Sequence, residues 1–222
     1  MEPALRILAA AAGAYLAGSI PWAVIVVRVF WKQDIRTLGS GNSGATNVLR
    51  VFGTAPGIAV LLLDAAKGAL GVWIAISLAP PAWAAGNDWF GVLGAMAAIA
   101  GHSFSPFIGF SGGKGVATAA GAITMLAPTV SAVLFVTFIV VVAVWKMVSL
   151  GSVVIAVLFP GVSWLLYPDN LPLRVFALLA TALVIWRHRT NLRRIAAGEE
   201  SKITFKRRMW DDVKRRMTKG SE

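Results

Sequence analysis

The sequence predicts an all-α protein that crosses a membrane several times, and three observations support this fold class. Apolar residues make up 57% of the 222 residues and charged residues only 14%, whereas soluble domains have roughly 45–50% and about 25%. The apolar residues gather in runs near the length that crosses a hydrocarbon core of about 30 Å. The Lys and Arg residues alternate between successive connections. Together these features predict one polytopic domain.

Seven apolar segments are expected to form transmembrane helices: roughly 4–29, 56–79, 89–108, 116–127, 129–147, 150–167 and 171–187. The fourth is short and rich in Ala and Gly, so we expect a tilted or partial span there. The first segment has little positive charge before it and no small-residue cleavage site after it. It therefore reads as a retained helix and not as a removed signal peptide.

The distribution of positive charge predicts the orientation of these helices. The formal net charge is +11, and we assign it to membrane orientation and not to nucleic-acid binding. Positive charge follows the first segment, is missing from the link 80–88, and returns at Lys114, at Lys146 and in the basic C-terminal tail. Because positive loops stay inside, the N-terminus is expected outside and the C-terminus in the cytoplasm. That arrangement requires an odd number of spans and puts every polar loop on the cytoplasmic side.

Composition also limits the cofactors. The chain has no cysteine and only two histidines, so it holds no disulfide or thiolate metal site. We expect neither a metal nor another cofactor.

The first polar loop has the composition of a phosphate site. Glycines permit close backbone approach, hydroxyl and amide side chains can bind oxyanions, and Arg50 offers a bidentate fork. A flexible, capped surface loop is the alternative, but the density of such groups disfavours it. The candidate residues are Gly39, Ser40, Gly41, Asn42, Ser43, Gly44, Thr46, Asn47 and Arg50.

A second polar loop follows His102 and carries Lys114 as a point charge among Gly112, Gly113 and Gly115. It superficially resembles a nucleotide-binding P-loop. However, the glycine spacing is one residue short, and Gly115 replaces the required Ser or Thr. We therefore exclude an NTPase and keep only phosphate binding. His102 is a candidate for either a buried hydrogen-bonding group or a catalyst.

The third polar region combines Ser149 with the end of the last apolar segment, where His188 and Asn191 stand among arginines. The charge alone is equally typical of a stop signal at the membrane interface. His188 could titrate near neutrality.

Two further features have open interpretations. Asp64 and Lys67 share a helix face in the second segment, and form either a structural ion pair or a layer supporting the polar loops. Residues 201–222 place apolar side chains at helical spacing among cations, which indicates an interfacial helix or a disordered basic tail. We divide the chain into a transmembrane domain, 1–200, and this tail, which should aid membrane association and not catalysis.

In its motifs, the chain resembles the bacterial acyl-phosphate:glycerol-3-phosphate acyltransferase family. The matching motifs occur in the family's order and cover about residues 10–200. They are Gly18-Ser19-Ile20-Pro21, the run 39–47 with Arg50, Asp64-x-x-Lys67-Gly68, Gly101-His102, Gly112-Gly113-Lys114-Gly115-Val116-Ala117-Thr118, Ser149, and His188-Arg189-x-Asn191 with Arg194.

The resemblance implies a seven-helix enzyme of the bacterial inner membrane with a cytoplasmic active site. Such an enzyme moves a fatty acyl group from acyl phosphate to the 1-hydroxyl of glycerol 3-phosphate, giving lysophosphatidic acid and phosphate. The catalytic residues it implies are Ser40, Asn42, Arg50, Lys114, His188 and Asn191. The substrate-binding residues are Gly39, Gly41, Ser43, Gly44, Thr46, Asn47, His102, Gly112, Gly113, Gly115 and Ser149.

The expected partners are the two substrates and the bilayer, with no nucleic acid. No Ser-His-Asp set is evident, so we expect direct transfer without an acyl-enzyme, and the proton acceptor is either His188 or a substrate phosphate. The chain lacks the His-x4-Asp motif of acyl-CoA-dependent enzymes. An organophosphate transporter is the alternative class, but seven spans do not divide into two equal repeats.

Overall fold

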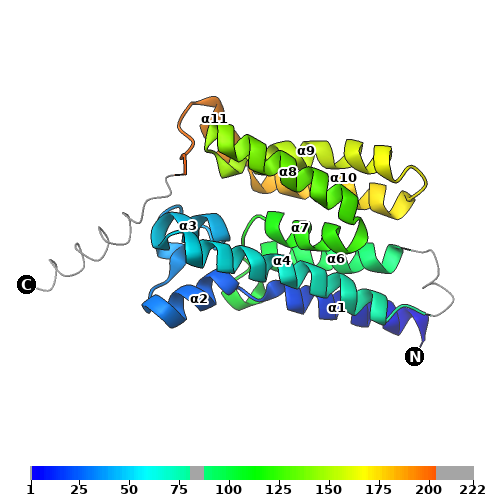
Figure 1. The fold of residues 1–222 in the computed structure, drawn as a ribbon. Helices are drawn as coiled ribbons and strands as arrows, with labels where there is room; N and C mark the ends of the chain where they lie inside the picture. The colour runs from blue at the N-terminus through cyan, green and yellow to red at the C-terminus, as the bar shows by residue number, and fades with distance from the viewer. Residues whose placement is uncertain (1, 81–87, 204–222) are drawn as a thin grey trace, which may run out of the picture.

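The computed structural model describes residues 2–80 and 88–203, and every regular element in these ranges is a helix (Figure 1). The first half contains α1 (Pro3–Ser19), α2 (Trp22–Trp31), η1 (Ile35–Thr37), α3 (Ala45–Phe52), α4 (Thr54–Ser77) and α6 (Trp89–Ser103). The second half contains η2 (Pro106–Ile108), α7 (Val116–Leu126), α8 (Pro128–Trp145), α9 (Val148–Leu166), α10 (Leu171–Arg187) and α11 (Arg189–Ala196).

The long helices run in alternate directions, so their connections gather at two ends of one bundle (Figure 1). At the end nearer the N-terminus, Arg6 of α1 donates to the carbonyl oxygen of Leu78 at 3.3 Å, and Asn170 donates to Asp88. The opposite end holds α3, α11 and all three polar loops. The fold thus brings together loops that are distant in sequence.

The prediction of an all-helical polytopic membrane protein is confirmed, whereas the number seven is not. Five helices are long and apolar enough to span a membrane, or up to six if α10 and α11, bent by 62°, form one span. The fourth predicted segment is α7, which has 11 residues. At about 1.5 Å per residue it extends only about 16 Å, roughly half of a hydrocarbon core.

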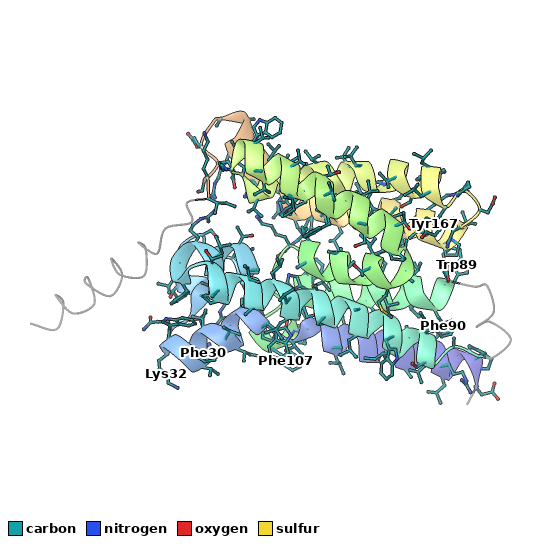
Figure 2. The ribbon with its side chains drawn as sticks, in the orientation of Figure 1. Phe30, Lys32, Trp89, Phe90, Phe107 and Tyr167 are labelled. Atoms are coloured by element: carbon teal, nitrogen blue, oxygen red, sulfur yellow. The ribbon has the colours of Figure 1, made fainter. Side chains whose placement is uncertain are left out.

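The lipid-facing side of the bundle explains its high apolar content. Helix α8 is strongly apolar and carries no charged residue, yet only 17% of its spanning window is buried within the protein. Phe135, Val136 and Val144 are each at least 61% exposed. Trp89 and Tyr167 lie at the end opposite the polar loops (Figure 2), as is typical of aromatic residues at a membrane interface.

Glycines allow α4 and α7 to pack at backbone distance. A Cβ atom added to Gly68 would overlap the carbonyl oxygen of Thr118, and one added to Gly121 would overlap that of Ala65. Such small-residue contacts are typical of helix association in membranes, where packing replaces the hydrophobic effect. The short α7, which begins just after Lys114, is thereby fixed against the long α4.

We predict that Gly68→Ala separates α4 from α7 and destabilises the protein by about 1–3 kcal/mol, as overpacking does. The measurement is the thermal midpoint in detergent. Gly161→Ala in α9 is the matched control, because no atom lies within 4 Å of its added Cβ. Equal midpoints for the two variants would contradict the close packing.

Candidate active site

The first polar loop is organised by Asn47, which is only 2% exposed. Its side-chain nitrogen lies within 3.2 Å of the carbonyl oxygens of Ile35, Leu38 and Asn42, and its side-chain oxygen accepts from the Ser40 backbone at 2.9 Å. These contacts use both N–H donors of the amide and one of the two lone pairs of its oxygen. Asn47 was predicted to bind substrate; in this structure it holds the loop in shape.

The second polar loop is tightly packed behind its glycines. The Gly112 N–H donates to the Ser103 carbonyl and the Gly113 N–H to the His102 carbonyl, both at 3.1 Å. An added Cβ at Gly113 would overlap Nε2 of His102, and one at Gly112 would overlap the His102 carbonyl. These two glycines therefore allow the loop to lie on His102, and their N–H groups are already bonded within the protein.

Free N–H groups remain further along this loop. The first bond at the start of α7 runs from the Ala119 N–H to the Gly115 carbonyl. The N–H groups of Val116 and Ala117 lie in the first turn, where a helix leaves its donors without intrahelical acceptors. This helix start adjoins Lys114, and the two together suit an anion.

Lys114 connects the second loop to the C-terminal part of the chain. Its ammonium donates to the side-chain oxygen of Asn191, whose nitrogen donates to Glu200 at 2.8 Å. The Ser149 hydroxyl donates to the same Glu200 oxygen at 2.7 Å. The third polar region therefore meets the second as predicted, through a chain of polar contacts.

Glu200 is a site residue that sequence reasoning missed. It is 9% exposed, and its second carboxylate oxygen is buried without a hydrogen-bond partner. Its charge also acts on Arg50, which brings the first polar loop to the same place. The only signal in the sequence was an acidic pair, Glu199 and Glu200, within a basic region.

The chain next to Glu200 also contacts the site. The Ile203 N–H donates to the Lys146 carbonyl at 2.7 Å, and Lys202 and Ile203 line a small pocket with Thr46 and Arg50. Part of the predicted tail thus lies against the site. The interfacial helix predicted for the rest of the tail falls on residues 204–222, outside the described residues.

The surroundings of Lys114 and His188 lower the pKa values of both side chains. Burial lowers the pKa of Lys114 to about 8; the Glu200 carboxylate opposes this shift, and the Arg50 guanidinium adds to it. Burial likewise lowers the pKa of His188 to about 4, and the charge on Lys114 adds to that shift. Near neutral pH, Lys114 is therefore a cation and His188 a neutral imidazole.

The tautomer of His188 follows from its partner. Its Nδ1 lies 2.8 Å from the carbonyl oxygen of Val184, which can only accept. Nδ1 therefore carries the proton, and Nε2 is left with a free lone pair. A buried neutral imidazole of this kind can accept a proton or a hydrogen bond.

Asp64, Lys67 and His102 form a buried cluster behind the second loop. Lys67 lies 3.0 Å from Asp64 and donates to the Ile20 carbonyl at 2.8 Å, while His102 Nδ1 lies 3.6 Å from the Asp64 oxygen. The predicted ion pair is present, and it lies behind the second polar loop. The pair is therefore both a structural ion pair and part of a layer behind that loop, which were the two interpretations of this pair. His102 is only 7% exposed and faces this pair and Gly113.

The remaining candidates of the first loop differ in exposure. Ser40 is exposed at the loop surface, Asn42 is half-buried, and Ser43 is 6% exposed.

Within residues 2–80 and 88–203 no group of three or more His, Asp or Glu side chains could hold a metal ion.

Comparison with known proteins identifies the kind of enzyme to which this site belongs. The family described as glycerol-3-phosphate acyltransferase matches residues 8–198. Glycerol-3-phosphate acyltransferases from Synechococcus sp. (strain JA-3-3Ab) and Shewanella loihica are each 42% identical to this chain. The alignments cover 90% and 94% of this chain and 94% and 98% of those proteins.

Solved structures agree with this assignment. The crystal structure of PlsY, an integral membrane glycerol 3-phosphate acyltransferase, in its glycerol 3-phosphate form is 32% identical with a TM-score of 0.78, over 89% of this chain and 96% of that one. Its lysophosphatidic acid form has a TM-score of 0.76. The fold is thus that of a multi-pass membrane acyltransferase. The chain belongs to the glycerol-3-phosphate acyltransferase family, enzymes of phospholipid synthesis that produce lysophosphatidic acid, and this membership excludes the transporter alternative.

The lowered pKa of Lys114 predicts an alkaline limb in the pH profile. Loss of its proton removes the charge for an anionic substrate, so kcat/KM should fall as pH rises through about 8. Bound phosphate favours the charged form, so the limb in kcat should lie at higher pH. The measurement is initial rate against pH. Lys114→Arg should move the limb upward, and an unchanged limb in that variant would assign it to another group.

Proposed function

We propose that this enzyme transfers a fatty acyl group from acyl phosphate to the 1-hydroxyl of glycerol 3-phosphate on the cytoplasmic face of the bacterial inner membrane. One observation carries the proposal. Arg50 and Lys114 come from two distant parts of the chain, and the Glu200 carboxylate acts on the charge of both at one end of the bundle, where the neutral His188 also lies. Two phosphate-bearing substrates need such a concentration of positive charge.

The proposed orientation follows from the two ends of the bundle. The end with the polar loops carries Lys32, Lys114 and Lys146 together with most of the arginines of the described residues, whereas Arg6 and Arg174 lie at the opposite end. Positive-inside bias therefore places the polar end in the cytoplasm. The alternating helices would give seven passes, with the short α7 crossing only part of the bilayer.

The chemical step requires no cofactor. The glycerol hydroxyl oxygen bonds to the acyl carbon, the bond between that carbon and the phosphate oxygen breaks, and phosphate leaves with the electron pair. The hydroxyl proton goes either to Nε2 of His188 or to a phosphate oxygen, whose second pKa is about 6. The leaving group is already good, so positioning and charge neutralisation supply most of the catalysis.

The structure suggests a division of roles among the predicted residues. Arg50, Lys114 and the start of α7 would neutralise the phosphates, and Ser40 and Asn42 would donate from the first loop. Asn191 and Ser149 both donate to Glu200, so in this state they hold the carboxylate. Asn191 orients Lys114, which donates to it. Asn47, Gly112 and Gly113 would support the loops from behind.

We predict that the enzyme uses acyl phosphate and not acyl-CoA, because the His-x4-Asp motif is missing and the site concentrates cations. The measurement is the initial rate of lysophosphatidic acid formation with each donor at the same acyl-chain length. Comparable turnover with acyl-CoA would refute the choice of donor.

We predict that Lys114→Ala and Arg50→Ala each lower kcat/KM by about ten- to hundredfold or more, since charge-assisted contacts contribute roughly 1.5–3 kcal/mol. Lys32→Ala is the control, because this exposed cation lies at the C-terminal end of α2. Normal kinetics in the two site variants, at normal expression, would mean that their charges serve only membrane orientation.

A further inference from the structure

We propose that Arg187 is a positioning residue that fixes the backbone of the second polar loop and so aims Lys114 and the start of α7 at a substrate phosphate. The inference rests on the proposed role of Lys114 and adds a residue that sequence reasoning had treated as part of a basic helix end.

The contacts of Arg187 are directed at the loop backbone. Its Nη2 donates to the Gly112 carbonyl at 2.7 Å and to the Gly113 carbonyl at 2.9 Å, and its Nε donates to the Gly113 carbonyl at 3.1 Å. A guanidinium can bind two successive carbonyls in this way because its donors form a rigid fork. A lysine, with one nitrogen, cannot reproduce the arrangement.

These bonds determine where the next N–H group points. A trans peptide is planar, with its C=O and N–H on opposite sides. The Gly113 carbonyl faces Arg187, so the N–H of Lys114 must point away from Arg187. In the preceding peptide the Gly112 carbonyl also faces Arg187, and the Gly113 N–H accordingly points the opposite way, to the His102 carbonyl. The hydrogen bonds from Arg187 thereby fix the orientation of two consecutive peptide groups, Gly112–Gly113 and Gly113–Lys114.

Arg187 is itself held by aromatic rings. Its guanidinium carbon lies 5.5 Å from the ring centre of Phe104 and 5.8 Å from that of Trp186, and the two rings lie 6.0 Å apart. Cation–π contacts of this kind orient the side chain and compensate part of its desolvation. The fork therefore reaches the loop from a fixed position.

The same region of the chain also meets Lys114 directly. Arg187 precedes His188 at the bend between α10 and α11, and Asn191 one turn later accepts from the Lys114 ammonium. Two sets of contacts therefore hold the second polar loop against this bend. Arg187 binds the backbone carbonyls of the loop, and Asn191 binds the side chain of Lys114. If the hydrogen bonds from Arg187 to the loop carbonyls are lost, Lys114 keeps its charge, but its backbone is no longer held in one position.

The test compares Arg187→Lys, Lys114→Ala and the double variant with the wild type, measuring KM and kcat separately for acyl phosphate and glycerol 3-phosphate. Arg187→Lys should raise KM about ten- to hundredfold for the substrate whose phosphate Lys114 holds, and little for the other. In the Lys114→Ala background the same change should have a clearly smaller further effect, because only the action of Arg187 on the start of α7 remains.

Arg193→Lys is the matched control, since it makes the same charge-conserving change at an exposed arginine of α11, at the same end of the molecule. Thermal midpoints in detergent show whether each variant is folded. Normal KM values in Arg187→Lys, or effects that add fully to those of Lys114→Ala, would overturn the inference. If instead Lys114→Ala itself has normal kinetics, the proposed function of Lys114 fails, irrespective of Arg187.

Discussion

A buried ion pair is the constraint on which the rest of the structure depends. Asp64 and Lys67 are 3% and 4% exposed in their side chains and lie 3.0 Å apart within α4. Desolvating such charges costs several kcal/mol for each ion unless further polar groups satisfy them. The structure supplies these groups at functional places: the Ile20 carbonyl at the break between α1 and α2, and His102 beneath the second polar loop. The pair therefore joins the helix break, α4 and the loop that carries Lys114.

A second constraint is charge balance at the polar end of the bundle. Burial lowers the pKa of Arg50 and the pKa of Lys114; the charge on Arg194 adds to the first shift, and the charge on Arg50 adds to the second. Glu200 offsets part of this repulsion and, through Ser149 and Asn191, links α9 and α11. The site still carries excess positive charge after this compensation, as a site for two phosphate-bearing substrates requires. An electrostatic site of this kind needs rigid supports more than it needs reactive side chains.

Sequence reasoning singled out three polar loops that the fold brings to one end of the bundle, but it did not give the contacts of their side chains. Runs of Gly, Ser and Asn are unusual in so apolar a chain, so the three loops were recognisable without coordinates. Gly112 and Gly113, however, were expected to bind substrate, and their N–H groups already donate to protein carbonyls. Glu200 and Arg187 were missed because their roles depend on partners 9 to 75 residues away, and no local pattern distinguishes such a residue from the surrounding charged residues.

The sequence by itself determined the membrane class, the long apolar helices, the shortness of the fourth apolar segment and the cationic loops, because hydropathy and local composition act over one helix or one turn. Tertiary structure decided that the loop before α7 lies against Asn191 and Arg187. It also decided which polar groups hold the loops and which remain free. These properties depend on packing between segments distant in the chain, where a buried polar group must find its partner wherever the fold places one.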